Sequence, residues 1–278
     1  MKTVTSSDGT TIAYEQLGSG SPLLLVDGAL CSRSFGPMPA LAALLKEHFT
    51  VVHYDRRGRG DSGDSPTYAV AKEIDDIKAL VAAMGGEAFI YGASSGAVLA
   101  ARAVAGGVRA KKLAMFEPPL ALDGKHCPEP KDYIEQIKDH LRAGRRVDAI
   151  KLFMKVVGVP GFAVFVMQFM PMFKGLKAIA HTLPYDFAIL GDTQRGGPLP
   201  DELRNTLRAV TVPTLVAAGG KSPDWFKHSA RVVSEQFGGE KHTAIVPGQN
   251  HNASAKAIAP MLIELFATES GKTSLRAA

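Results

Sequence analysis

"EAFIYGASSGAVLA", residues 87–100, is the stretch that decides the fold of this chain. Its first half is a short apolar run typical of a buried strand, and its second half has the composition of a helix. Between them, Gly92-Ala93-Ser94-Ser95-Gly96 fits G-x-S-x-G, the turn that lifts a serine hydroxyl above the carboxyl edge of a sheet. The alternative is a Gly/Ser-rich turn without chemistry. The strand before and the helix after favour a nucleophilic Ser94, with Ser95 serving packing and donation from its backbone amide.

Short apolar runs alternate with helical patterns on both sides of this stretch, which predicts a mostly parallel sheet with helices on both faces. The runs are "SPLLLVDG", "HFTVVHYD", "KKLAMFE", "VPTLVAAG" and "HTAIVPG". The first residues alternate around Asp8-Gly9, so an antiparallel pair is expected at the leading edge. After Glu117 the alternation lapses for about ninety residues, as expected for a helical insertion. We therefore predict a core of residues 1–117 and 206–270, a helical cap of residues 118–205, and a disordered tail of residues 271–278.

Composition bounds the class of protein. The 278 residues are 46% hydrophobic and carry a net charge of +5 from 32 basic and 27 acidic residues. The basic residues are scattered in pairs, which argues against nucleic-acid binding. Only Cys31 and Cys127 could pair, and the N-terminus lacks a signal segment, so we expect a cytoplasmic protein without a disulfide framework. The apolar stretch Leu152 to Phe173 is broken by Gly and Pro and predicts two short helices, with no membrane as a partner.

A nucleophilic serine needs a base. His251 follows the last apolar run in "AIVPGQNHNAS" and comes last in chain order, where this kind of triad places its histidine. The other seven histidines lack such a context. His53, inside "VVHYD", is more typical of a core residue, and His48, His140 and His242 sit beside charged residues at the expected ends of elements.

Four motifs in this order and spacing, "LLLVDGA", "VVHYDRRGRGDSGDS", "YGASSGA" and "PGQNHN", resemble the α/β-hydrolase superfamily, especially small bacterial carboxylesterase and peroxidase-like members with a helical cap. The resemblance implies a doubly wound sheet of about eight strands. It also implies an oxyanion hole formed by the backbone N–H of Ala29 or Leu30 and that of Ser95. Many relatives have His-Gly where this chain has Asp27-Gly28.

The triad acid is the open question. In most of the superfamily it follows the penultimate strand, where this chain has Ser222 in "TLVAAGGKSPDW". A serine cannot stabilise an imidazolium as a carboxylate does. Glu117, at the end of "KKLAMFE" and stiffened by Pro118-Pro119, is our preferred acid, and Asp224 is the alternative.

These residues predict a serine hydrolase that cleaves an ester or related acyl bond and needs no cofactor and no metal. Its partner would be a small, largely apolar molecule, and the chain a monomer or homodimer. The alternatives are a receptor-like binding protein with an inert serine, or a non-hydrolytic enzyme for perhydrolysis or carbon–carbon cleavage. Gly58 to Gly63 matches G-x-G-x-x-G but lies in the hydrolase-like loop, where Asp55 and the arginines Arg56 to Arg59 are expected to form ion pairs. The predicted pocket residues are Phe35, Phe165, Met167 and Trp225.

Overall fold

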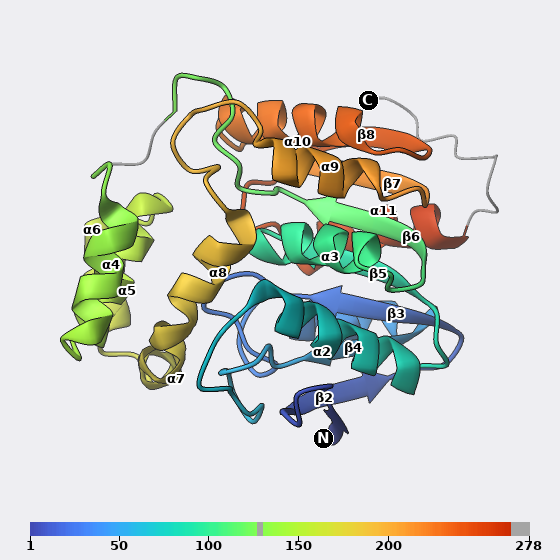
Figure 1. The fold of residues 1–278 in the computed structure, drawn as a ribbon, viewed down its shortest axis with the longest axis horizontal. Helices are drawn as coiled ribbons and strands as arrows, with labels where there is room; N and C mark the ends of the chain where they lie inside the picture. The colour runs from blue at the N-terminus through green and yellow to red at the C-terminus, as the bar shows by residue number, and fades with distance from the viewer. Residues whose placement is uncertain (127–129, 268–278) are drawn as a thin grey trace.

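Eight strands form one sheet in the order β1-β2-β4-β3-β5-β6-β7-β8 (Figure 1). The computed structural model describes residues 1–126 and 130–267, so Cys127 and the predicted tail lie outside the described residues. The first strand pairs antiparallel with the second, and the second with the fourth, whereas every other pair is parallel. The expected leading hairpin and mostly parallel sheet are confirmed. The strands are β1 (Lys2–Thr5), β2 (Thr11–Leu17), β3 (Ser21–Val26), β4 (Phe49–Tyr54), β5 (Ala88–Ala93), β6 (Ala110–Phe116), β7 (Thr214–Gly219) and β8 (Lys241–Val246).

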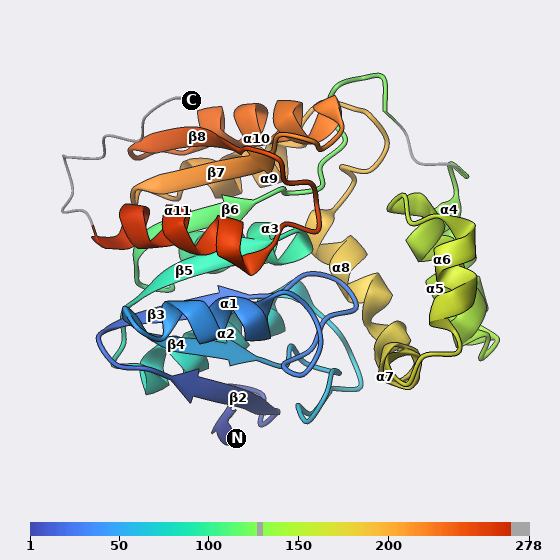
Figure 2. The same ribbon diagram turned by 180° about the vertical axis from the view of Figure 1, so that it is seen from behind.

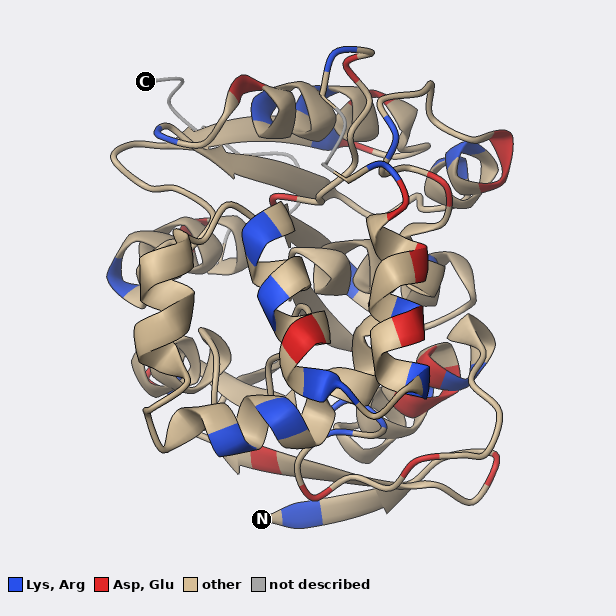
Figure 3. Cartoon of the chain, turned by 90° about the vertical axis from the view of Figure 1, so that its left-hand side faces the viewer, with Lys and Arg blue, Asp and Glu red and all other residues tan. Residues whose placement is uncertain are grey.

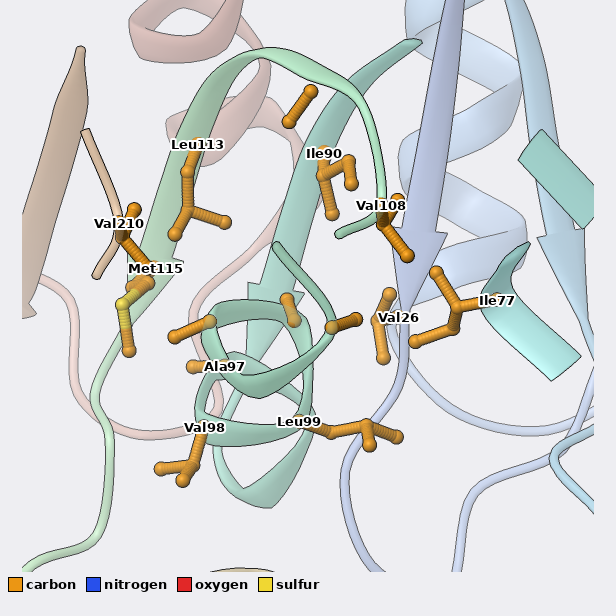
Figure 4. Close-up of a cluster of buried hydrophobic side chains, with 14 of the residues drawn as sticks. Val26, Ile77, Ile90, Ala97, Val98, Leu99, Val108, Leu113, Met115 and Val210 are labelled. Carbon is orange, nitrogen blue, oxygen red and sulfur yellow. The ribbon is translucent and has the colours of Figure 1, made fainter. Parts of the chain in front are cut away.

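Helices cover both faces of the sheet because the central strands are apolar on both sides. In β3, Leu23 and Leu25 face one buried cluster, and Leu24 and Val26 face the other. Helices α1 (Met38–Leu45) and α11 (Ala255–Ala267) cover the first face (Figure 2). The second face is covered by α2 (Val70–Ala83), α3 (Ser95–Ala105), α9 (Asp201–Arg208) and α10 (Asp224–Gln236). Figure 4 shows this second cluster, where strand residues such as Ile90 and Leu113 pack around α3.

The helical insertion lies beyond the carboxyl ends of the parallel strands (Figure 1). Its helices are α4 (Tyr133–Arg142), α5 (Arg146–Val156), α6 (Gly161–Met167), α7 (Met172–Ile179) and α8 (Leu183–Leu190). α8 packs against α3 and so connects the insertion to the core. The predicted boundary between residues 205 and 206 falls inside α9, whose Leu203 and Leu207 belong to the main core cluster.

The long apolar stretch is divided among α5, α6 and α7, so it contains more than the two short helices expected from its sequence. Across the described ranges, no single helix is long and apolar enough to cross a membrane. By length and composition, only α6 combined with residues 172–190 would pass as a pair, and the two parts are bent by 102°.

Candidate active site

Ser94 occupies a sharp turn between β5 and α3. Its backbone has φ 57° and ψ −130°, a conformation that costs energy for a residue with a side chain. The two glycines of the motif are required because a side chain at either position would clash with the neighbouring backbone. A Cβ added to Gly92 would lie 2.4 Å from the Gly96 carbonyl oxygen, and one added to Gly96 would lie 2.4 Å from the Val26 carbonyl oxygen. The turn therefore has the tight geometry that the sequence predicts for a nucleophile elbow.

Backbone strain gathers at this site. Among the described residues, only three without the freedom of glycine have positive φ: Leu30, Ser94 and Glu117. They follow β3, β5 and β6, three adjacent parallel strands whose carboxyl ends meet at one edge of the sheet. Strained backbone of this kind persists where the surrounding structure holds it in place, and it is typical of functional sites.

Glu117 is the carboxylate that contacts the candidate base. Its side chain is fully buried; Oε2 lies 2.8 Å from His251 Nδ1, and Oε1 accepts a 2.7 Å hydrogen bond from the Gly219 backbone N–H. Asp224 does not reach the histidine. Its side chain is 99% exposed and pairs with Lys227 one turn along α10, because the helix begins at Asp224 and turns it outward. Of the two predicted acids, the structure brings only Glu117 to His251.

Ser222, at the position where relatives are expected to carry the acid, is buried, and its hydroxyl has no hydrogen-bond partner within the described part of the chain. The carboxylate thus comes from the end of β6 instead of the loop after β7.

The His251 ring is held in one orientation. It stacks on Phe226 with ring centroids 4.8 Å apart, and Glu117 engages Nδ1. A carboxylate on Nδ1 selects the tautomer in which Nδ1 carries the proton, which leaves Nε2 as the basic nitrogen. Ser94 and His251 line the same cavity but are not hydrogen-bonded to each other in this structure. Such contacts are often long without substrate and tighten in the reacting complex.

The loop after β3 packs directly on the candidate nucleophile. A Cβ added to Gly28 would lie 2.9 Å from the Ser94 Cβ, so only glycine fits there. Arg59 donates a 2.5 Å hydrogen bond to the Gly28 carbonyl oxygen, and Arg56 donates a 3.3 Å hydrogen bond to that of Asp27. Two buried guanidinium groups therefore fix the path of this loop.

Both arginines converge on Asp186 of α8, a residue that sequence reasoning missed. Asp186 Oδ1 accepts hydrogen bonds from Arg56 at 2.6 Å and from the Ser95 hydroxyl at 2.7 Å, and Oδ2 pairs with Arg59 at 2.8 Å. Burial alone would raise the pKa of Asp186, but the two guanidinium groups outweigh it and the pKa is lowered. One buried carboxylate thus connects the Ser95 turn, the loop after β3 and the insertion.

A cavity of about 560 Å³ opens beside these groups and is lined by Ala29, Ser94, Ser95, His251 and Trp225. Of the two predicted donors after β3, Ala29 lines the cavity, whereas the Leu30 side chain is buried in a cluster with the cap helices. Most of the remaining lining is apolar or aromatic. It includes Pro119, Ala121, Tyr133, Phe153, Val156, Val157, Val159, Pro160, Phe187, Leu190 and Phe226.

Three predicted pocket residues lie elsewhere. Phe35 lines a separate cavity between the loop after β3 and α7. Phe165 is exposed and packs edge-on against Phe169, and Met167 packs on the cap cluster. Phe165 and Met167 do not line the cavity with Ser94 because Val164 and Phe173 are the residues of this segment that are buried. The α5–α6 turn lines the cavity instead.

The family described as "Alpha/beta hydrolase family" matches residues 18–260. The chain belongs to the α/β-hydrolase family. It is similar to the crystal structure of an α/β-hydrolase from Sphaerobacter thermophilus DSM 20745, with 45% identity, a TM-score of 0.85, and coverage of 95% of this chain and 100% of that one.

More distant α/β-hydrolases share the fold. A thermophilic esterase from Thermogutta terrifontis is 20% identical, with a TM-score of 0.63 and coverage of 96% of this chain and 97% of that one. The enol-lactonase from Burkholderia xenovorans LB400 is 18% identical, with a TM-score of 0.69 and coverage of 96% and 100%. Family membership supports hydrolase activity in general.

Within this α/β-hydrolase, Asp27 departs from the usual His-Gly. Its Oδ1 accepts a 3.0 Å hydrogen bond from the Gly28 backbone N–H, and Oδ2 is buried with no partner among the residues described. Burial raises the pKa of Asp27 to about 7. The carboxyl is therefore largely protonated below neutral pH, which reduces its repulsion of a nearby oxyanion.

Proposed function

We propose that this α/β-hydrolase is a serine esterase that cleaves an ester or related acyl bond through an acyl-enzyme. The observation that carries the proposal is the buried Glu117 carboxylate, which lies 2.8 Å from Nδ1 of His251. His251 and Ser94 line the same cavity. A nucleophile, a base and an orienting acid on three separate segments are the parts that acyl transfer requires.

Each residue has one role in the reaction. Ser94 Oγ attacks the substrate carbonyl carbon while His251 Nε2 takes the hydroxyl proton. Glu117 holds the ring and stabilises the imidazolium, and the backbone N–H groups of Ala29 and Ser95 bind the oxyanion. His251 then gives the proton to the leaving alcohol. A water molecule, deprotonated by the same nitrogen, hydrolyses the ester of Ser94 and releases the acid.

The cavity indicates the substrate class. Its described lining is mainly apolar; it includes the Asp186 carboxylate, whose charge is balanced by the buried arginines, and Lys221. A volume of about 560 Å³ lies within the range of sites for drug-sized molecules. We therefore propose small esters with an apolar acyl or aromatic part as substrates.

The direct test is hydrolysis of a p-nitrophenyl ester series, from acetate to octanoate, by the wild type and Ser94→Ala. The expected result is turnover by the wild type and its loss in Ser94→Ala, with circular dichroism unchanged. An alkyl phosphonate probe should add one equivalent to the wild type and none to the variant, as intact-protein mass spectrometry would show.

Two features favour a binding protein with an inert serine: Ser222 at the usual acid position, and Asp27 beside the oxyanion hole. The Glu117–His251 contact argues against the first, because a carboxylate from another strand engages the histidine. If the wild type turns over no ester and Ser94 ignores the phosphonate, the esterase proposal fails and saturable ligand binding becomes the property to measure.

A further inference from the structure

Exposed apolar side chains are concentrated in one short segment of the insertion. Nine large hydrophobic residues are exposed in the described structure, and six of them lie between residues 157 and 170. Scattered apolar residues on a surface are ordinary, but a contiguous group marks an interaction site. Phe162 and Phe169 are the most exposed of the six, at 79% and 77%. We call this group the α6 face; it consists of Val157, Phe162, Phe165, Val166, Phe169 and Met170.

The inner side of the same segment is anchored in the protein. Val164 and Phe173 are buried in the cap, and Met167 packs against its cluster. The α6 face is therefore presented outward by a segment that is fixed from behind. α6 has 7 residues, so at about 1.5 Å per residue it is far too short to cross a hydrocarbon core of about 30 Å. At a membrane, α6 could therefore lie only on the surface and not span it.

Cationic residues flank the α6 face. Lys151 and Lys155 on α5, and Lys174 and Lys177 on α7, are exposed, and none has a side-chain ion pair with any residue the structure describes. Residues 145–182 contain six Lys or Arg and one Asp. Of the 32 basic and 27 acidic residues in the chain, 26 of each lie outside this segment, so the segment accounts for the whole net charge of +5. Figure 3 shows this end of the molecule, where a helix without charged residues lies beside helices that carry Lys and Arg.

We propose that the α6 face and its four flanking lysines bind the surface of an anionic lipid bilayer. Aromatic and aliphatic side chains surrounded by lysines are typical of segments that lie in the membrane interface, with apolar groups among the acyl chains and cations at the headgroups. A second copy of this chain is a poorer occupant, because a symmetric contact would bring the two sets of lysines together. This inference departs from the prediction that the protein has no membrane partner.

The position of this face is consistent with the cavity. Residues 156–160, in the turn between α5 and α6, line the cavity that contains Ser94, and Val157 belongs to both surfaces. A bilayer bound at the α6 face would therefore lie beside the cavity wall. The binding proposal itself does not depend on the proposed esterase activity.

The test is co-sedimentation of the 278-residue protein with sucrose-loaded vesicles of phosphatidylcholine, with and without 30% phosphatidylglycerol. We expect at least tenfold stronger partitioning to the anionic vesicles, weakened by 0.5 M salt. Phe162→Ser/Phe169→Ser and Lys151→Gln/Lys155→Gln/Lys174→Gln/Lys177→Gln should each lower partitioning at least tenfold. Leu44→Ser/Ile245→Ser, which changes two exposed apolar residues elsewhere, should bind like the wild type.

Circular dichroism of each variant establishes that it is folded. The proposal is overturned if the wild type does not sediment with anionic vesicles, or if the control variant loses as much binding as the α6-face variant. It is also overturned if light scattering shows a dimer that Phe162→Ser/Phe169→Ser dissociates, because a second copy then covers the face. Since no step measures turnover, failure of the esterase proposal would leave this result unaffected.

Discussion

Replacing Glu117 with Gln should nearly abolish turnover while leaving the fold intact. The carboxylate accepts two hydrogen bonds, from the Gly219 N–H at 2.7 Å and from His251 Nδ1 at 2.8 Å. Gln has the same shape but only one oxygen, so it can serve one of these donors. If the oxygen stays on Gly219, the amide NH₂ faces His251 and forces Nδ1 to be an acceptor, which puts the proton on Nε2. If the amide flips, two donors oppose each other at Gly219.

The first arrangement disables the base, because a protonated Nε2 cannot accept the proton of Ser94. Both arrangements also remove the negative charge that stabilises the imidazolium. From these losses we expect kcat to fall by about 10³–10⁴, or roughly 4–5.5 kcal/mol at about 1.4 kcal/mol per tenfold. KM should change little, because the Glu117 side chain is buried behind the histidine.

The assay is steady-state hydrolysis of the best p-nitrophenyl ester by the wild type, Glu117→Gln and Asp224→Asn. Asp224→Asn is the matched control, since the same chemical change is made on a fully exposed side chain and should leave kcat within about twofold. The reasoning is refuted if Glu117→Gln keeps more than about a third of the wild-type kcat, or if Asp224→Asn loses as much as Glu117→Gln does.

Three further predictions concern the groups around the triad. Asp186→Asn removes a buried carboxylate shared by Arg56 and Arg59, of which Arg56 keeps its pair with Glu73. The free energy of unfolding in urea should fall by about 3–5 kcal/mol. Because Asp186 also accepts the Ser95 hydroxyl, kcat should fall about tenfold or more, and an unchanged kcat would contradict the link to Ser95. The pKa of Asp27 is raised to about 7 in the folded protein, whereas in the unfolded chain this carboxyl loses its proton near pH 4. Between these two pH values the folded protein holds the proton more tightly, so the contribution of Asp27 to stability falls as pH rises. Asp27→Asn should therefore raise the free energy of unfolding in urea, relative to the wild type, more at pH 8 than at pH 5. The difference between the two pH values should be up to about 4 kcal/mol. An equal effect at both pH values would count against the raised pKa of Asp27. Gly96→Ala places a Cβ 2.4 Å from a β3 carbonyl oxygen and should lower the melting temperature strongly, whereas Gly175→Ala, with open space around it, should leave it unchanged or raise it.

The sequence predicted the parts of the fold and site that depend on local pattern. The Ser94 turn requires glycine at two fixed positions, because a Cβ at Gly92 or Gly96 would lie too close to a backbone oxygen. This requirement is why the turn could be predicted from the sequence. Glu117 could be selected because it ends a strand, and the carboxyl ends of parallel strands meet at one edge of the sheet. The pairing of Glu117 with His251 spans 134 residues and still follows from topology.

The parts that could not be predicted depend on how the insertion packs. The arginines of the "YDRRGRGDSG" loop were expected to pair within their own loop. Instead, Arg56 and Arg59 reach Asp186, 130 and 127 residues away, and nothing in the pattern of α8 distinguishes that aspartate. Phe165 and Met167 lie away from the cavity for the same reason. Composition identified the apolar segment, but the direction in which Phe165 points depends on which neighbours fill the inner side of the short helix.

Asp186 also limits how this enzyme can be rebuilt. A chimera that exchanges the whole insertion for that of a related hydrolase would have its junctions at the two ends of the insertion. Here such an exchange would remove α8, and with it the only contact the structure describes between the Ser95 hydroxyl and a carboxylate. The unit that can be exchanged is therefore shorter, α4 to α7, with the second junction before Leu183. Grafts made at that point keep the buried arginines neutralised while changing the walls of the cavity.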